Sequence, residues 1–118
     1  MSRFQVFAGP IVVGYSEFEG GDPPMGTAVS RFSPIPAYQT IQPLVVAARE
    51  GSQDHLTLAV YTADGRVLPA QGGVQIIDYS AELGAEGIEV HIMGIGYPLY
   101  EEFFPEHVAA YRLQFRSK

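Results

Sequence analysis

Alternating apolar and polar side chains predict a chain built mainly of β-strands. In residues 55–61, leucine or valine occupies every second position from Leu56 to Val60, which is the period expected of a strand with one buried face. Asp64 and Gly65 follow as a strong hairpin-turn signal. By the same pattern and by turn residues at their ends, further strands are predicted at residues 3–6, 11–15, 27–32, 74–79 and 88–93.

Apolar residues three or four positions apart predict helices, chiefly near the C-terminus. Val108, Tyr111 and Phe115 lie on one face of a helix over residues 106–115. A strand with Tyr111, Leu113 and Phe115 on one face is the alternative for this segment. Shorter helices are predicted at residues 37–41, 43–50 and 98–103, with a strand at 44–46 as the alternative to the second of them.

These elements predict an α+β fold with a largely antiparallel sheet and a C-terminal helix. An all-β sandwich or barrel with short loop helices is the alternative. The 118 residues correspond to a single domain spanning 1–118. We expect Val60, Ile76, Val90 and Ile92 to be buried in one sheet, because each lies on an apolar face of its strand.

The composition excludes several classes of protein. The chain has no cysteine, so disulfides, thiolate catalysis, zinc fingers and iron–sulfur clusters are excluded. No apolar run approaches the ~20 residues that a membrane-spanning helix needs, and the first residues do not resemble a secretory signal. We therefore expect a mature, soluble, cytoplasmic protein that is not bound to a membrane.

Charge is distributed unevenly along the chain. The net charge is −6, and no lysine or arginine occurs in residues 67–111. A basic protein partner is therefore favoured, and nucleic acid is disfavoured because its phosphates repel acidic surfaces. The acids of this stretch are Asp78, Glu82, Glu86, Glu89, Glu101, Glu102 and Glu106.

The sequence contains none of the strongest motifs of enzymes. It has no nucleophile elbow, phosphate-binding loop or dinucleotide fingerprint, and His55, His91 and His107 do not form a metal-binding pattern. We therefore expect no cofactor and no metal, and catalysis is not favoured. The alternative is a small pocket formed by Tyr79, His91, Tyr97 and Glu101, which would bind a small molecule or catalyse a reaction.

Two segments have the composition of binding surfaces. Residues 20–26 combine glycine with proline in a stiff loop, with Asp22 and Met25 at its tip. Residues 94–105 place aromatic side chains beside two acids, which is typical of interface anchors. The predicted binding residues are therefore Glu86, Glu89, Tyr97, Tyr100, Glu101 and Glu102, with Asp22 and Met25.

Taken together, the sequence favours a small acidic interaction protein that binds a basic protein partner. An inhibitor or an immunity-type protein is the most specific form of this hypothesis. The acids would raise the rate of association, and Tyr97 and Tyr100 would slow dissociation. The alternatives are the small-molecule or enzyme pocket near His91 and a structural subunit of a homo-oligomer.

Overall fold

The computed structural model describes residues 4–18, 20–22, 26–48, 51–96 and 99–116, which form an α+β fold with 34% helix and 37% strand. The strands are β1 (Phe4–Ala8), β2 (Ile11–Ser16), β3 (Gly20–Asp22), β4 (Thr27–Arg31), β5 (Ser33–Pro34), β6 (Leu58–Tyr61), β7 (Gly73–Asp78) and β8 (Ile88–Met93). The α-helices are α1 (Gln42–Ala47), α2 (Ser80–Leu83), α3 (Leu99–Phe103) and α4 (Pro105–Arg116), and the 3₁₀ turns are η2 (Pro36–Thr40), η3 (Asp54–Leu56) and η4 (Gly84–Gly87).

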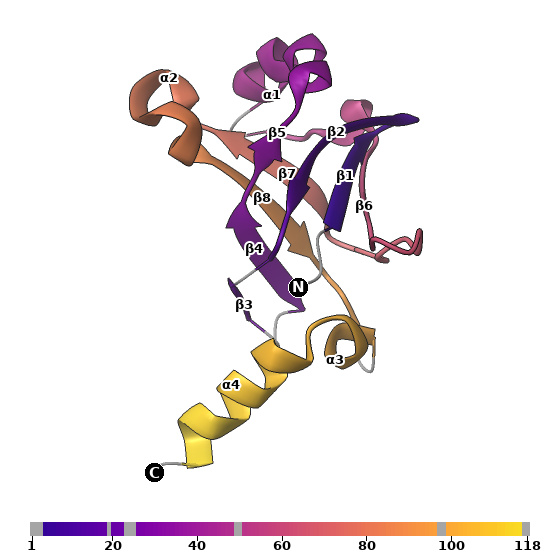
Figure 1. The fold of residues 1–118 in the computed structure, drawn as a ribbon, viewed down its shortest axis with the longest axis vertical. Helices are drawn as coiled ribbons and strands as arrows, with labels where there is room; N and C mark the ends of the chain where they lie inside the picture. Colours follow the sequence, from indigo (N-terminus) through magenta and orange to yellow (C-terminus); the bar gives the residue numbers. More distant parts are fainter. Residues whose placement is uncertain (1–3, 19, 23–25, 49–50, 97–98, 117–118) are drawn as a thin grey trace.

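The strands form two antiparallel four-stranded sheets (Figure 1). The first sheet has the order β5-β2-β1-β6, and the second has the order β3-β4-β8-β7. The predicted strands at 11–15, 74–79 and 88–93 are confirmed as β2, β7 and β8, and the predicted C-terminal helix is confirmed as α4. The α+β prediction is therefore confirmed, with the strands divided between two sheets.

One hydrophobic core contains residues of both sheets. Ile76, Val90 and Ile92 are buried in the second sheet, as predicted. Val60 is also buried, but it pairs with Val6 in the first sheet. The expectation that all four residues share one sheet is therefore wrong, because an alternating pattern shows which face of a strand is buried and not which strand lies beside it.

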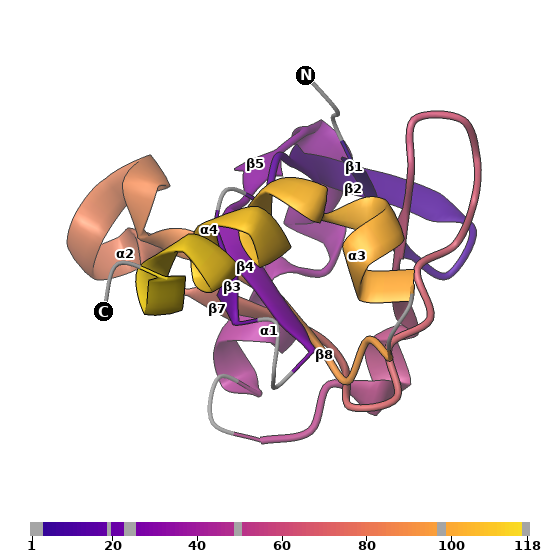
Figure 2. The same ribbon diagram turned by 90° about the horizontal axis from the view of Figure 1, so that it is seen from below.

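The helices lie at the two ends of the molecule. Helices α1 and α2 lie at one end, whereas α3 and α4 lie at the other (Figure 1). Seen from this second end, α4 lies in front of β3 and β4 (Figure 2). On α4, His107 and Val108 are buried, while Leu113 is 64% exposed, so the beginning of α4 is packed on the body and its later part extends from it.

Two connecting segments differ from expectation. The turn at Asp64 and Gly65 predicts that a strand returns over residues 67–70, but Val67 forms an isolated bridge to Tyr61. Pro69 lies two residues further on and has no N–H to extend a ladder. In residues 80–87 two glycines favour a loop over the alternative of a helical turn, but the segment forms α2 and η4. Gly84 lies at the end of α2 with φ +76°, so a glycine here ends a helical turn and does not prevent one.

Two antiparallel arms of the chain connect the sheets. The first arm contains β2 and β3, and the second contains β4 and β5. Backbone pairing joins Tyr15 to Ser33 and, further along, Gly20 to Val29. Between these pairs the first arm has residues 16–19 and the second has only residues 30–32, so the register shifts and the sheets part at this level.

Aromatic side chains on each arm fix this interruption. The Phe18 backbone is in the left-handed region (φ 49°), and its ring is fully buried against Phe4 and Phe104. On the other arm, the buried ring of Phe32 packs over Gly14 so closely that a side chain at Gly14 would collide with it. Each arm is thus held by its own aromatic contact with the core.

Candidate functional site: a polar groove where the sheets part

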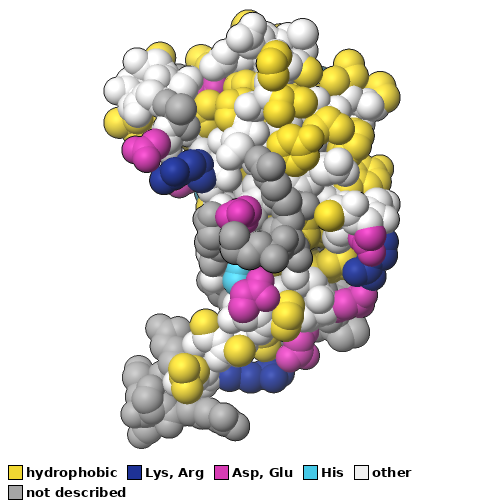
Figure 3. Space-filling view, viewed as in Figure 1, with side chains coloured by type: hydrophobic (Ala, Val, Ile, Leu, Met, Phe, Trp, Pro, Cys, Tyr) yellow, Lys and Arg dark blue, Asp and Glu magenta, His cyan; other side chains and the backbone are white. Residues whose placement is uncertain are grey.

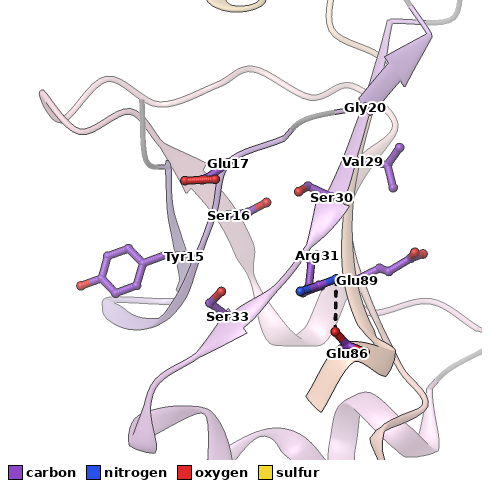
Figure 4. A pocket seen from close by; sticks show the side chains of 10 residues that line it. All are labelled: Tyr15, Ser16, Glu17, Gly20, Val29, Ser30, Arg31, Ser33, Glu86 and Glu89. Carbon is purple, nitrogen blue, oxygen red and sulfur yellow. Dashed lines mark ion pairs between the residues drawn. The ribbon is translucent and has the colours of Figure 1, made fainter. Parts of the chain in front are cut away.

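A groove of about 860 Å³ lies where the two arms separate (Figure 4). It is formed by residues of both sheets and by η4, which follows α2. Its volume lies in the range of ligand sites, but its walls are largely polar. The residues that line it are Tyr15, Ser16, Glu17, Gly20, Val29, Ser30, Arg31, Ser33, Glu86 and Glu89.

Negative charge predominates in the groove. Glu17 comes from the first arm, Glu86 from η4 and Glu89 from β8, whereas Arg31 is the cation among the described residues that line it. Arg31 lies 3.6 Å from Glu86, and both side chains are well exposed. Glu89 lies 3.1 Å from the Nε2 atom of His91. The groove therefore has an excess of carboxylates over positive charges.

Hydroxyl groups complete the walls. Ser16 and Ser30 are buried and Ser33 is exposed, and the Ser16 hydroxyl oxygen accepts a hydrogen bond from the Phe18 backbone N–H (3.3 Å). The chemistry of these walls is suited to binding polar and cationic groups.

The structure places only some of the predicted acids in this groove. Glu86 and Glu89 line it, but Glu101 and Glu102 lie on α3, outside it. Glu101 pairs with Arg112 at 3.1 Å, and Glu102 pairs with Arg66 at 2.6 Å. Arginines from other parts of the chain thus neutralise acids of the stretch 67–111. Figure 3 accordingly shows Lys and Arg side chains beside Asp and Glu at several places on one face.

Tyr100 is not placed as a surface anchor. Its side chain is fully buried, so the expectation that it contacts a partner directly is not compatible with its position. The helix around it is short, and its buried face cannot be identified from so few apolar positions. Tyr97, Met25 and the side chain of Asp22 lie outside the described residues.

The alternative pocket near His91 is not formed by the residues that line the groove. His91 is half-buried on β8, Tyr79 is 37% exposed just before α2, and Glu101 is on α3. None of these three residues lines the groove. His91 does contact Glu89, as their spacing on one strand face suggests.

His107 is buried, although its place beside Glu106 in the first turn of the C-terminal helix predicts a solvent-exposed side chain. Its Nε2–H donates a hydrogen bond to the Phe18 carbonyl (2.7 Å). Its Nδ1 atom lies 2.9 Å from the Tyr100 hydroxyl, which donates to the Thr27 carbonyl (2.6 Å). These contacts hold α3 and α4 against the two arms of the chain that form the groove.

Asp78 is a second buried polar group, at the opposite end of the molecule. Its carboxylate accepts hydrogen bonds from the Tyr38 hydroxyl (2.6 Å), the Gln42 amide (3.1 Å) and the Ser80 backbone N–H (2.8 Å). Burial raises the pKa of Asp78, but these hydrogen bonds outweigh burial and leave its pKa lowered. Burial and the neighbouring carboxylate raise the pKa of Tyr38. This network is structural, because it ties η2 and α1 to β7 and α2.

Sequence reasoning did not find Tyr15, Ser16, Glu17, Ser30, Arg31 and Ser33 as groove residues. The available signal was that 11–15 and 27–32 are consecutive predicted strands, which places the two strands side by side but does not bring Glu17 next to Arg31. The interruption between the arms has no comparable signal. It depends on Phe18 adopting a positive φ, which is uncommon for a residue with a side chain.

No protein family, curated protein or solved structure matches the chain. Within the described residues, no group of three or more histidine, aspartate or glutamate side chains is arranged to hold a metal ion. None of the helices in the described ranges has the length and apolar character needed to cross a membrane. A functional interpretation therefore depends on the residues of the groove.

Proposed function

We propose that this protein is an acidic interaction protein that binds a basic protein partner through the groove. The observation that carries the proposal is that Glu17, Glu86 and Glu89, from three separate segments of the chain, line one concave site in which Arg31 is the opposing charge. A lysine or arginine side chain entering the groove would find carboxylates and hydroxyl oxygens as hydrogen-bond acceptors.

A protein partner is favoured over other ligands by the character of the groove. Sites for small molecules are mostly apolar, whereas this one is lined largely by charged and hydroxyl side chains. Phosphate groups of a nucleic acid would meet an excess of carboxylates and a chain of net charge −6. A basic segment of a protein matches both the charge and the open shape.

An inhibitor or immunity-type role in the cytoplasm is the specific form that we propose. Such a protein acts by occupying a partner's surface, and charge complementarity would raise its rate of association. The aromatic segment 94–105 would support the fold through Tyr100 and Phe104, which are both fully buried.

Calorimetric titration with two matched peptides tests the charge preference. The first is a heptapeptide that alternates serine with lysine, and the second replaces each lysine with glutamate. We expect only the lysine peptide to bind, with an affinity that falls as salt is raised. If both peptides bind equally, or if neither binds at low salt, the proposed function is wrong.

Paired variants test the location of binding. The double variant Glu17→Gln, Glu89→Gln should weaken binding of the lysine peptide about three- to tenfold, because exposed charge pairs contribute about 0.2–1 kcal/mol each. The control Asp54→Asn, Glu106→Gln makes the same change in net charge at exposed residues outside the groove. Equal weakening by both double variants would show that overall charge, and not the groove, binds the peptide.

A further inference from the structure

The ion pair in the groove is looser than the arginine–glutamate pairs at α3. The closest Arg31–Glu86 contact is 3.6 Å, whereas Arg66–Glu102 and Arg112–Glu101 have contacts of 2.6 and 3.1 Å. A separation of 3.6 Å lies beyond the usual hydrogen-bond range of about 2.7–3.2 Å. Arg31 and Glu86 therefore attract each other by charge without a well-formed hydrogen bond.

The backbone fixes the place of Arg31 while its side chain remains adjustable. Arg31 is the last residue of β4 and pairs with Glu89 on β8. Its guanidinium extends to Glu86 on η4, at the wall of the groove (Figure 4). The Arg31 and Glu86 side chains are 61% and 79% exposed, so moving the guanidinium away from Glu86 requires no change in the core.

From this geometry we infer that Arg31 is a built-in competitor of the partner's cation. In the free protein Arg31 is paired with Glu86. When the partner fills the groove, a lysine or arginine of the partner displaces Arg31 from Glu86. The inference rests on the proposed function, and it adds a way for the groove to select among the cations of different partners. A partner cation that contacts Glu86 no more closely than Arg31 does gains no affinity from replacing it. A cation that forms shorter hydrogen bonds to Glu86 gains affinity.

Removing the competitor should strengthen binding, which is the opposite of the effect expected for loss of a direct contact. We expect Arg31→Gln to bind the serine–lysine heptapeptide about two- to fivefold more tightly, since an exposed pair of this kind is worth at most about one kcal/mol. Arg112→Gln is the matched control, because it removes one positive charge outside the groove. The control should change the affinity less than Arg31→Gln does.

A double-mutant cycle tests whether the effect acts through Glu86. In a Glu86→Gln background, Arg31→Gln should produce little of its gain, because the carboxylate that Arg31 occupies is absent. If Arg31→Gln weakens binding, leaves it unchanged, or strengthens it no more than Arg112→Gln does, the inference is overturned. It is also overturned if the full gain persists without Glu86.

The cycle separates failure of this inference from failure of the proposed function. If the Glu17→Gln, Glu89→Gln variant binds the lysine peptide more weakly but Arg31→Gln binds it no more tightly, the proposed function is supported and the competitor inference is wrong. If the unmodified protein shows no preference for the lysine peptide, both the proposed function and the competitor inference are wrong.

Discussion

Tyr100 joins separate parts of the chain through one hydroxyl group. It donates to the Thr27 carbonyl and lies 2.9 Å from His107 Nδ1, in a side chain with no exposed surface. We expect Tyr100→Phe to lower the free energy of unfolding by about 1–3 kcal/mol, because buried polar groups lose their partner. Urea unfolding measures the change, with Tyr61→Phe on a half-buried side chain as the control. Equal stability of Tyr100→Phe and the unmodified protein would contradict the structural role.

Gly21 has no room for a side chain. A Cβ atom at this position would collide with the Tyr100 hydroxyl and would approach His107 Nδ1 to 2.5 Å. We expect Gly21→Ala to lower the unfolding free energy by about 1–3 kcal/mol through overpacking. Gly51→Ala is the control, since no atom of the residues that the structure describes lies within 4 Å of its added Cβ. Thermal unfolding of the two variants measures the difference, and an equally small change in both would show that the Tyr100–His107 contact is not tightly packed.

At the scale of elements, Asp78 connects η2 and α1 to β7. Hydrogen bonds lower its pKa in the folded protein, so its stabilising effect is present above the unfolded pKa of about 3.9 and is lost as the pH falls through the folded pKa. We expect Asp78→Asn to cost about 2 kcal/mol at pH 7, because an amide cannot accept all the same hydrogen bonds.

Urea unfolding at a series of pH values checks the role of the Asp78 charge. The difference in stability between Asp78→Asn and the unmodified protein should begin to shrink as the pH falls below about 4, where Asp78 of the unfolded chain takes up a proton before Asp78 of the folded protein does. A difference that stays constant from pH 7 to pH 3 would mean that the Asp78 charge does not stabilise these elements.

Whether a segment forms a strand or a helix was more predictable than which strands lie side by side. The alternating patterns of 74–79 and 88–93 predict β7 and β8, and the spacing of Val108 and Tyr111 favours α4. The assignment of β6 to a separate sheet was not predictable, because it depends on the pairing of Val60 with Val6 across the fold. Such pairings are set by packing between distant segments.

At the scale of the whole molecule, folding redistributes the charge. The stretch 67–111 is uniformly acidic in sequence, yet Arg31, Arg66 and Arg112 place positive charges against Glu86, Glu102 and Glu101. The sequence could identify Glu86 and Glu89 as candidate site residues from their charge alone. It could not show that Glu17 and Arg31 line the same groove, because the groove forms where the pairing between the two arms is interrupted.

Mapping of backbone amide chemical shifts by NMR during titration with the serine–lysine heptapeptide tests the central claim most directly. We expect the shifts to concentrate in residues 15–17, 30–33 and 86–89, and to diminish in the Glu17→Gln, Glu89→Gln variant. Shifts concentrated instead on α3 and α4, around Glu101 and Glu102, would contradict binding in the groove.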